Sequence, residues 1–104
     1  MNFQEKKLEA LLKKATIYKS MKNVTVYMGP MCAFCDAAKR LLKRNNIPYK
    51  EINVAIEDGK RDEMLSKSNG RRTIPQIFFN EYHVGGYEEL RALEKKGELL
   101  NLIK

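Results

Sequence analysis

The chain has 104 residues, of which 43% are hydrophobic, and its 20 Lys and Arg against 13 Asp and Glu give a formal net charge of +7 at pH 7. This length predicts one domain with its own core, because a chain of this size buries roughly two thirds of its unfolded surface on folding. Two cysteines and one histidine exclude both a secreted disulfide framework and a four-ligand zinc site within one chain.

The basic residues are spread along the chain, mostly on the polar faces of predicted helices. Because no exposed aromatic residues alternate with them and no nucleic-acid reading helix is recognisable, we interpret them as solvated faces and expect no nucleic-acid partner. No apolar run approaches the ~18–20 residues that span a bilayer, and the N-terminus lacks the apolar stretch of a signal peptide. The sequence therefore predicts a cytoplasmic protein without a membrane partner.

Residues 1–20 predict an amphipathic helical extension ahead of the compact unit. Leu8, Leu11, Leu12 and Ala15 follow the i, i+3, i+4, i+7 spacing of a helix face. Three alternatives stay open: the helix docks on the domain, mediates self-association, or is loosely attached. Since Met21 would itself suit the start of the compact unit, we expect the domain to span residues 21–104.

The sequence of the first half of the domain predicts a βαβ unit. The β-branched and aromatic run at residues 23–28 predicts a buried strand, which Gly29-Pro30 ends. Residues 33–46 predict a helix with an apolar and a basic face, and residues 49–54 predict the second strand. A right-handed crossover makes these two strands parallel.

The second half predicts a helix, a hairpin and a closing helical region. The helix at residues 58–68 ends at Asn69-Gly70, and the hairpin has strands at residues 76–79 and 82–84. A helix at residues 87–96 and a last helical turn follow. The order of elements predicts an α/β fold, a four-stranded mixed sheet flanked by helices on both faces.

Cys32 and Cys35 lie where the first strand gives way to the helix, a context in which a CxxC spacing indicates redox chemistry. On the first helical turn the two residues face the same way, close enough for a disulfide. Unpaired N–H groups and the macrodipole at the helix start favour an anion, so we interpret Cys32 as the thiolate nucleophile. Cys35 is interpreted as the resolving thiol, the alternative being a buried, inert cysteine.

The sequence resembles glutaredoxins from about residue 22 to residue 104. Three blocks carry the resemblance in order: residues 32–35 (CAFC) after the first strand, residues 72–78 (RTIPQIF) and residues 83–90 (HVGGYEEL). The resemblance implies a thioredoxin-like fold. It also implies a glutathione-dependent thiol–disulfide oxidoreductase that reduces protein disulfides and glutathione mixed disulfides, with glutathionylated proteins and ribonucleotide reductase among its partners.

The resemblance implies that glutathione, as co-substrate, is held by two segments. A cis Ile74–Pro75 bond would present the backbone of Ile74 to the cysteine portion of glutathione, whereas the residues alone favour an ordinary trans proline. The double glycine leaves backbone N–H groups open at the start of a helix for the γ-glutamyl end, where Glu88 replaces the usual Asp. The expected glutathione-binding residues are Arg61, Thr73, Ile74, Pro75, Gly86, Tyr87 and Glu88.

The chain departs from the family pattern beside the cysteine pair. Gly29 stands where many glutaredoxins have the Lys that meets the glycyl carboxylate of glutathione, so Arg61, with Arg71 and Arg72 behind it, is the substitute candidate. Each of these arginines is otherwise a surface cation. Phe34 replaces the usual Tyr and loses its hydroxyl. We expect the single His83 to be structural.

Ala33 stands where proline is common, and this opens an alternative function. Some relatives without the proline form dimers around a [2Fe–2S] cluster, which is held by the first cysteine of each chain and two glutathione thiolates. The alternative is therefore a glutathione-assisted cluster carrier or sensor, with Cys32 as the protein ligand. We expect a monomer unless a cluster is bound.

Overall fold

The computed structural model describes residues 21–104, so the predicted N-terminal extension and the domain boundary at Met21 lie outside or at the edge of the described part. Within that part no helix is long and apolar enough to cross a lipid bilayer. The elements are β1 (Val24–Met28), α2 (Ala33–Arg44), β2 (Lys50–Asn53), α3 (Lys60–Lys67), β3 (Gln76–Phe79), β4 (Tyr82–Gly85), α4 (Tyr87–Lys95) and α5 (Leu99–Ile103).

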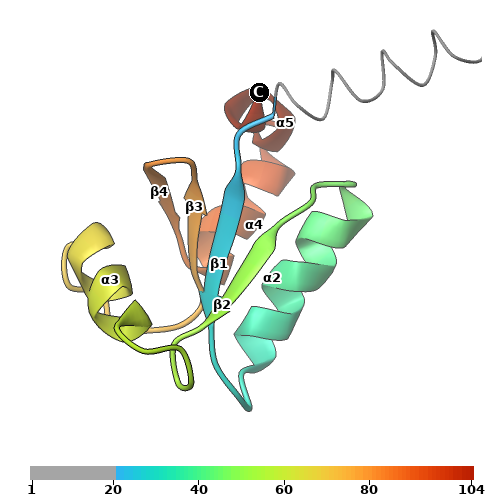
Figure 1. The fold of residues 1–104 in the computed structure, drawn as a ribbon. Coiled ribbons are helices and arrows are strands. Elements are labelled where there is room, and N and C mark those ends of the chain that lie inside the picture. The colour runs from blue at the N-terminus through green and yellow to red at the C-terminus, as the bar shows by residue number, and fades with distance from the viewer. Residues whose placement is uncertain (1–20) are drawn as a thin grey trace, which may run out of the picture.

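The strands form the predicted four-stranded mixed sheet, in the order β2-β1-β3-β4 (Figure 1). β1 runs parallel to β2 and antiparallel to β3, with Val26 opposite Glu51 on one side and Ile77 on the other. β3 and β4 form the predicted antiparallel hairpin. This topology confirms the α/β fold and the parallel pairing of the first two strands.

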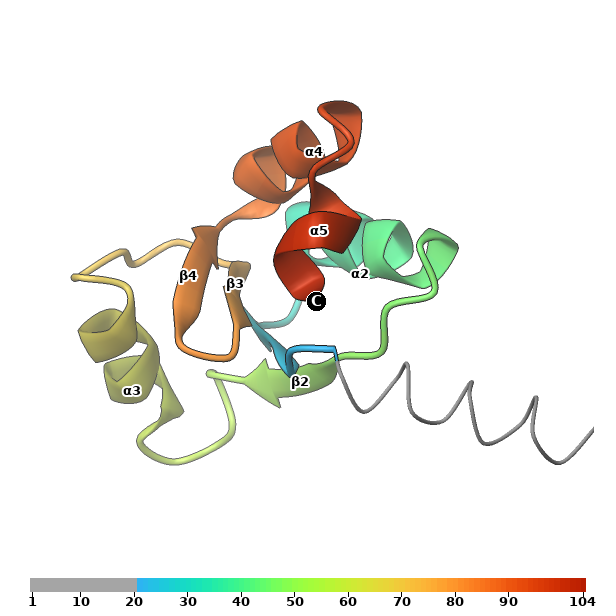
Figure 2. The same cartoon turned by 90° about the horizontal axis from the view of Figure 1, so that it is seen from above.

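Helices cover both faces of the sheet, with α2, α4 and α5 on one side and α3 on the other (Figures 1 and 2). Alternate residues of a strand point to opposite faces, so Val24 and Val26 join the larger core under α2, α4 and α5. Tyr27 joins the smaller core under α3, to which that helix contributes the completely buried Met64. The Tyr27 hydroxyl donates a 2.6 Å hydrogen bond to Glu63, which ties α3 to the sheet.

Helix α2, which begins between the two cysteines, buries Cys35, Ala38, Leu41 and Leu42, at the spacing of one helix face. The helix ends at Arg44, two residues before the predicted end at residue 46. Asn46 adopts a left-handed φ of 58°, and an α-helix cannot continue through a residue with such a φ. α3 likewise begins at Lys60, since Gly59 has a φ of 74°. These two turns are the reason that both helices are shorter than their polar patterns predict.

Candidate active site

The two cysteines occupy the junction of β1 and α2, and the structure joins them in a disulfide with their Cα atoms 5.2 Å apart. Cys32 is the N-cap residue of α2, and its Sγ accepts a 3.1 Å hydrogen bond from the N–H of Cys35. Cys35 is only 1% exposed, whereas Cys32 is partly exposed. An incoming sulfur therefore reaches Cys32 first, at the end of a helix that stabilises a thiolate.

The loop between α3 and β3 lies directly against this disulfide. The Ile74–Pro75 peptide bond is cis, as the family resemblance implied and against the expectation from the residues alone. The carbonyl oxygen of Ile74 lies 3.7 Å from Cys32 Sγ. The backbone that follows Thr73 therefore forms one wall beside the reactive sulfur.

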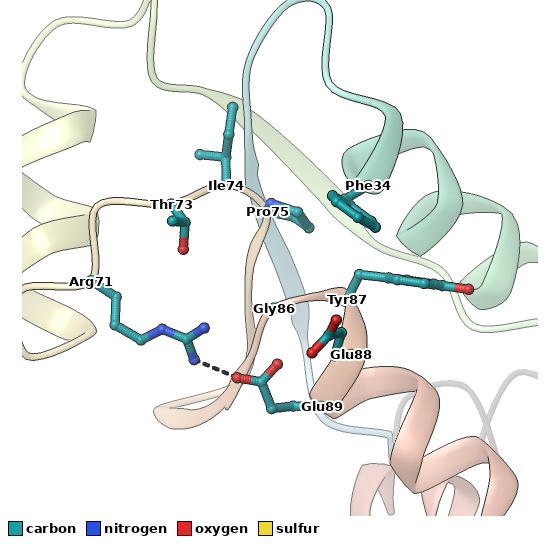
Figure 3. Close-up of a pocket in the computed structure, with 9 residues that line it drawn as sticks. All are labelled: Phe34, Arg71, Thr73, Ile74, Pro75, Gly86, Tyr87, Glu88 and Glu89. Atoms are coloured by element: carbon teal, nitrogen blue, oxygen red, sulfur yellow. Dashed lines mark hydrogen bonds and ion pairs between the residues drawn. The ribbon is translucent and has the colours of Figure 1, made fainter.

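A cavity of about 160 Å³ opens beside Ile74, the residue whose carbonyl oxygen lies near Cys32 Sγ (Figure 3). Neither cysteine lines it. Three segments meet around it: the start of α2, the loop before β3 and the start of α4. The structure thus brings six of the seven predicted glutathione-binding residues together. The lining consists of Phe34, Arg71, Thr73, Ile74, Pro75, Gly86, Tyr87, Glu88 and Glu89.

Arg61 is the predicted residue that does not line this cavity. It is exposed on the first turn of α3, on the other face of the sheet from α2 and α4. Arg71 and Arg72 were the further candidates from the sequence for the cation that meets the glycyl carboxylate. Arg71 lines the cavity, whereas Arg72 does not. Among the cationic side chains of the described residues, Arg71 is therefore the one that lines the cavity.

Arg71 is held across the cavity by Glu89, with 2.6 Å between Nη1 and Oε1 (Figure 3). Burial disfavours the ionised Glu89, but the hydrogen bond from Arg71 and the N–H groups of Gly86 and of Glu89 itself hold its pKa below the usual value. Gly85 leaves room for this carboxylate, because a Cβ there would lie 2.7 Å from Glu89 Oε1. The cavity therefore contains an internal ion pair at the start of α4.

Glu89 is a cavity residue that was not predicted from the sequence, although its position carries a signal. The N-cap residue of α4 is Gly86, which has no side chain to accept a hydrogen bond from the first helical N–H groups. A Glu three residues after the N-cap commonly reaches back and accepts a hydrogen bond from the backbone N–H of the N-cap residue, here Gly86. This spacing singles out Glu89 rather than Glu88 as the residue whose carboxylate lies at the helix start.

Gly29, which replaces the lysine that many glutaredoxins carry, lies against the side chain of Ile74. It is buried, and a Cβ placed on it would lie 2.9 Å from Cδ1 of Ile74. A side chain at this position therefore requires a shift of Cδ1, which is the far end of the flexible Ile74 side chain.

Phe34 keeps the aromatic ring of the tyrosine that glutaredoxins usually have at this position. Its ring stacks on that of Tyr87, with 6.0 Å between the centroids and 27° between the planes. At 60% exposure, Phe34 still presents much of its surface to solvent. The two rings join α2 to the start of α4 along one side of the cavity.

No group of three or more His, Cys, Asp and Glu side chains within residues 21–104 is arranged to hold a metal ion. The [2Fe–2S] alternative calls for Cys32 from two chains and for two glutathione thiolates, so it stays a prediction.

Comparisons with known proteins agree with this geometry. The Glutaredoxin family model matches residues 24–84. Glutaredoxin 3 of Escherichia coli strain K12 is 39% identical over 84 residues, covering 81% of this chain and 100% of that protein. Glutaredoxin 1 of Rickettsia prowazekii is 38% identical over 82 residues, covering 78% of this chain and 86% of the relative.

The solved structures also include a close likeness in fold. The solution structure of glutaredoxin from Brucella melitensis is 44% identical, with a TM-score of 0.71, and the match covers 82% of this chain and 91% of that one. With its CxxC disulfide, the chain therefore belongs to the glutaredoxin family and is a thiol–disulfide oxidoreductase of the thioredoxin fold.

Proposed function

We propose that the chain uses reduced glutathione to reduce protein disulfides and glutathione mixed disulfides. The observation that carries this proposal is the cavity beside Cys32, whose lining combines the Ile74 backbone, a helix start and the Arg71 guanidinium. Such a cavity suits a small peptide thiol with carboxylates at both ends, because helix N–H groups bind carboxylates and Arg71, whose Nη1 is paired with Glu89, has further N–H donors on its guanidinium. Family membership supports the same substrate.

In the proposed cycle the Cys32 thiolate attacks one sulfur of the substrate disulfide. A mixed disulfide forms on Cys32, and one substrate thiolate leaves. The Cys35 thiolate then attacks Cys32 Sγ, which closes the Cys32–Cys35 disulfide seen in the structure and releases the second substrate thiolate. Both cysteines are oxidised by this step, and the substrate gains two electrons.

Two glutathione molecules return the enzyme to the dithiol. The first attacks Cys32 Sγ and releases the Cys35 thiolate, and the second attacks the resulting mixed disulfide to leave as oxidised glutathione. For a glutathionylated protein, Cys32 accepts the glutathionyl group and the protein thiolate leaves. One free glutathione then removes the glutathionyl group from Cys32 as oxidised glutathione, so Cys35 is not needed. The two substrate classes therefore differ in their requirement for Cys35.

The binding roles follow the places of the residues around the cavity. The Ile74 backbone lies beside Cys32, where the cysteine portion of glutathione must sit. The α4 start, with Gly86, Tyr87 and Glu88, suits the γ-glutamyl end. We assign the other carboxylate to Arg71 in place of Arg61, because only Arg71 lines the cavity. Protein partners, ribonucleotide reductase among them, and a cytoplasmic location belong to the same proposal.

The test is glutathione-coupled turnover of a small glutathione mixed disulfide and of a protein disulfide, by wild type, Cys32→Ser and Cys35→Ser. We expect Cys32→Ser to abolish both activities and Cys35→Ser to lose only the reduction of the protein disulfide. Negligible wild-type turnover of both substrates would contradict the proposal. Visible absorbance after anaerobic reconstitution with iron, sulfide and glutathione, dependent on Cys32, would then support the cluster alternative.

A further inference from the structure

A chain of hydrogen bonds links the hairpin to the loop beside Cys32. His83 Nε2 lies 2.6 Å from Gln76 Oε1. The amide nitrogen of Gln76 in turn donates to the carbonyl oxygen of Thr73 at 3.0 Å and to its hydroxyl oxygen at 3.1 Å. Gln76 is completely buried, so these partners satisfy an amide that water does not reach.

The direction of these hydrogen bonds is fixed by their ends. A backbone carbonyl oxygen only accepts, so the group of Gln76 that faces Thr73 has to be the NH₂ group. Oxygen Oε1 then faces His83, and the histidine must donate through Nε2–H. His83 Nε2 is therefore engaged as a donor in the neutral and the charged imidazole alike, and it is not free to act as a general base.

The imidazole itself is held in place by the hairpin. His83 lies opposite Phe78 in the pairing of β4 with β3. Its ring stacks on that of Phe78, with 4.7 Å between the centroids and 21° between the planes. Because the ring of His83 is half-buried and stacked, the donor of the hydrogen bond to Gln76 is held at a fixed position on the sheet.

We propose that His83 is a positioning residue, which acts through Gln76 to hold Thr73 and the Ile74 backbone in the conformation that receives the thiol-bearing part of the substrate. Thr73 and Ile74 both line the cavity, and Ile74 O lies 3.7 Å from Cys32 Sγ. A loop that has to present its backbone to a ligand benefits from such support, because small displacements weaken binding strongly. The identity of that ligand as glutathione rests on the proposed function.

Three variants of the full chain test the inference. His83→Phe keeps a ring that can stack on Phe78 but removes the donor. His83→Gln restores an N–H donor, since its amide nitrogen is as many bonds from Cα as His Nε2 is. Tyr82→Phe is the matched control, a change on the same strand at a side chain that is 51% exposed.

The first readout is KM and kcat with a small glutathione mixed disulfide. We expect His83→Phe to raise KM about five- to tenfold, because a buried acceptor loses its partner, and to change kcat less than about twofold. His83→Gln and Tyr82→Phe should stay within about twofold of wild type. An unchanged KM in His83→Phe, or equal losses in His83→Phe and His83→Gln, would overturn the inference.

The second readout does not depend on turnover. The chain has a single histidine, so ¹⁵N NMR reports its tautomer without ambiguity. We expect the Nε2–H form in neutral His83, and amide shifts at Thr73 and Ile74 that appear in His83→Phe and revert in His83→Gln. A neutral Nδ1–H form, or unmoved loop amides, would also overturn the inference. If wild type does not turn over, the proposed function fails and this readout alone decides the role of His83.

Discussion

The disulfide and the cavity beside it are built from the chain in different ways. Cys32 and Cys35 are separated by three positions at the start of one helix, and the local backbone suffices to bring their Cα atoms within 5.2 Å. The cavity instead requires the start of α2, the loop before β3 and the start of α4 to meet (Figure 3). Thiol exchange therefore depends on local geometry, and substrate binding depends on the whole fold.

This difference separates two kinds of damage. Changes that alter packing between distant segments should weaken binding while the cysteine pair still exchanges thiols. Changes at the cysteines should stop exchange and leave the fold intact. Single substitutions test this separation.

Leu42→Ala should destabilise the fold without preventing disulfide formation. Leu42 is completely buried in the core between α2 and the sheet. Loss of such a side chain costs about 2–5 kcal/mol of unfolding free energy, measured by urea denaturation. The Cys32–Cys35 disulfide should still form in the urea-unfolded chain, as peptide mapping would show. Leu100→Ala, at a side chain that is 48% exposed, is the control and should cost far less.

Arg71→Gln should weaken binding of a glutathione mixed disulfide, with KM raised about tenfold and kcat nearly unchanged, because a charge-assisted hydrogen bond to a carboxylate is lost. Its ion pair with Glu89 is exposed, so thermal unfolding should change little. Arg72→Gln is the matched control, since Arg72 is exposed and does not line the cavity. Equal effects of the two substitutions on KM would show that overall charge, rather than the cavity, attracts the substrate.

Glu94→Gln should lower stability in a pH-dependent way. Glu94 accepts two hydrogen bonds from Arg44 and one from Asn45, which join α4 to the end of α2. The hydrogen bond from Arg44, more than burial or Asn45, decides that the pKa of Glu94 lies below its ordinary value. Ionised Glu94 therefore stabilises the folded state above the unfolded-state pKa of about 4.3, and this stabilisation is lost as the pH falls through the folded pKa.

The expected difference between wild type and Glu94→Gln is about 1 kcal/mol at pH 7, since part of the network is exposed. It should shrink toward zero as both folded and unfolded Glu94 become protonated. Urea denaturation at several pH values measures it, with Glu98→Gln as the control at an exposed acid of the same region. A difference that stayed constant down to pH 2 would show that the carboxylate charge is not the cause.

Gly29→Lys should fail to improve binding, although it restores the lysine common in the family. Its Cβ meets Cδ1 of Ile74 at 2.9 Å, so the isoleucine has to move. We expect Gly29→Ala to raise KM by about threefold through this displacement, equivalent to about 0.7 kcal/mol. Gly29→Lys should show the same steric loss, at most offset by its charge. A KM below wild type for Gly29→Lys would show that the cavity adapts freely around Ile74.

Much of the fold was predictable because its signals are local. The alternation along β1 separates Val26 from Tyr27 onto opposite faces, and the spacing of Ala38, Leu41 and Leu42 marks one face of α2. Helix ends were less predictable. Asn46 and Gly59 take positive φ angles that end or delay the helices, and the polar pattern of the sequence continues through both positions.

The candidate site was predictable only in part. Motifs identified the cysteine pair, the Thr73–Pro75 segment and the start of α4 as one site through the family resemblance. Which arginine reaches that site was not predictable, because Arg61 and Arg71 are both surface cations in the sequence and only their elements place them apart. The role of Glu89 was readable from its spacing to Gly86 but was overlooked.

The sequence by itself determined the order of the elements, the alternation that makes the sheet two-sided and the cysteine spacing that permits a disulfide. These features depend on residues within a few positions of one another, where backbone geometry is regular. Only the tertiary structure decided that Gly29 lies against Ile74, that Glu89 holds Arg71, and that His83 reaches Thr73 through Gln76. Such contacts join segments that are distant along the chain, so they depend on the packing of the whole domain and leave no periodic signal in the sequence.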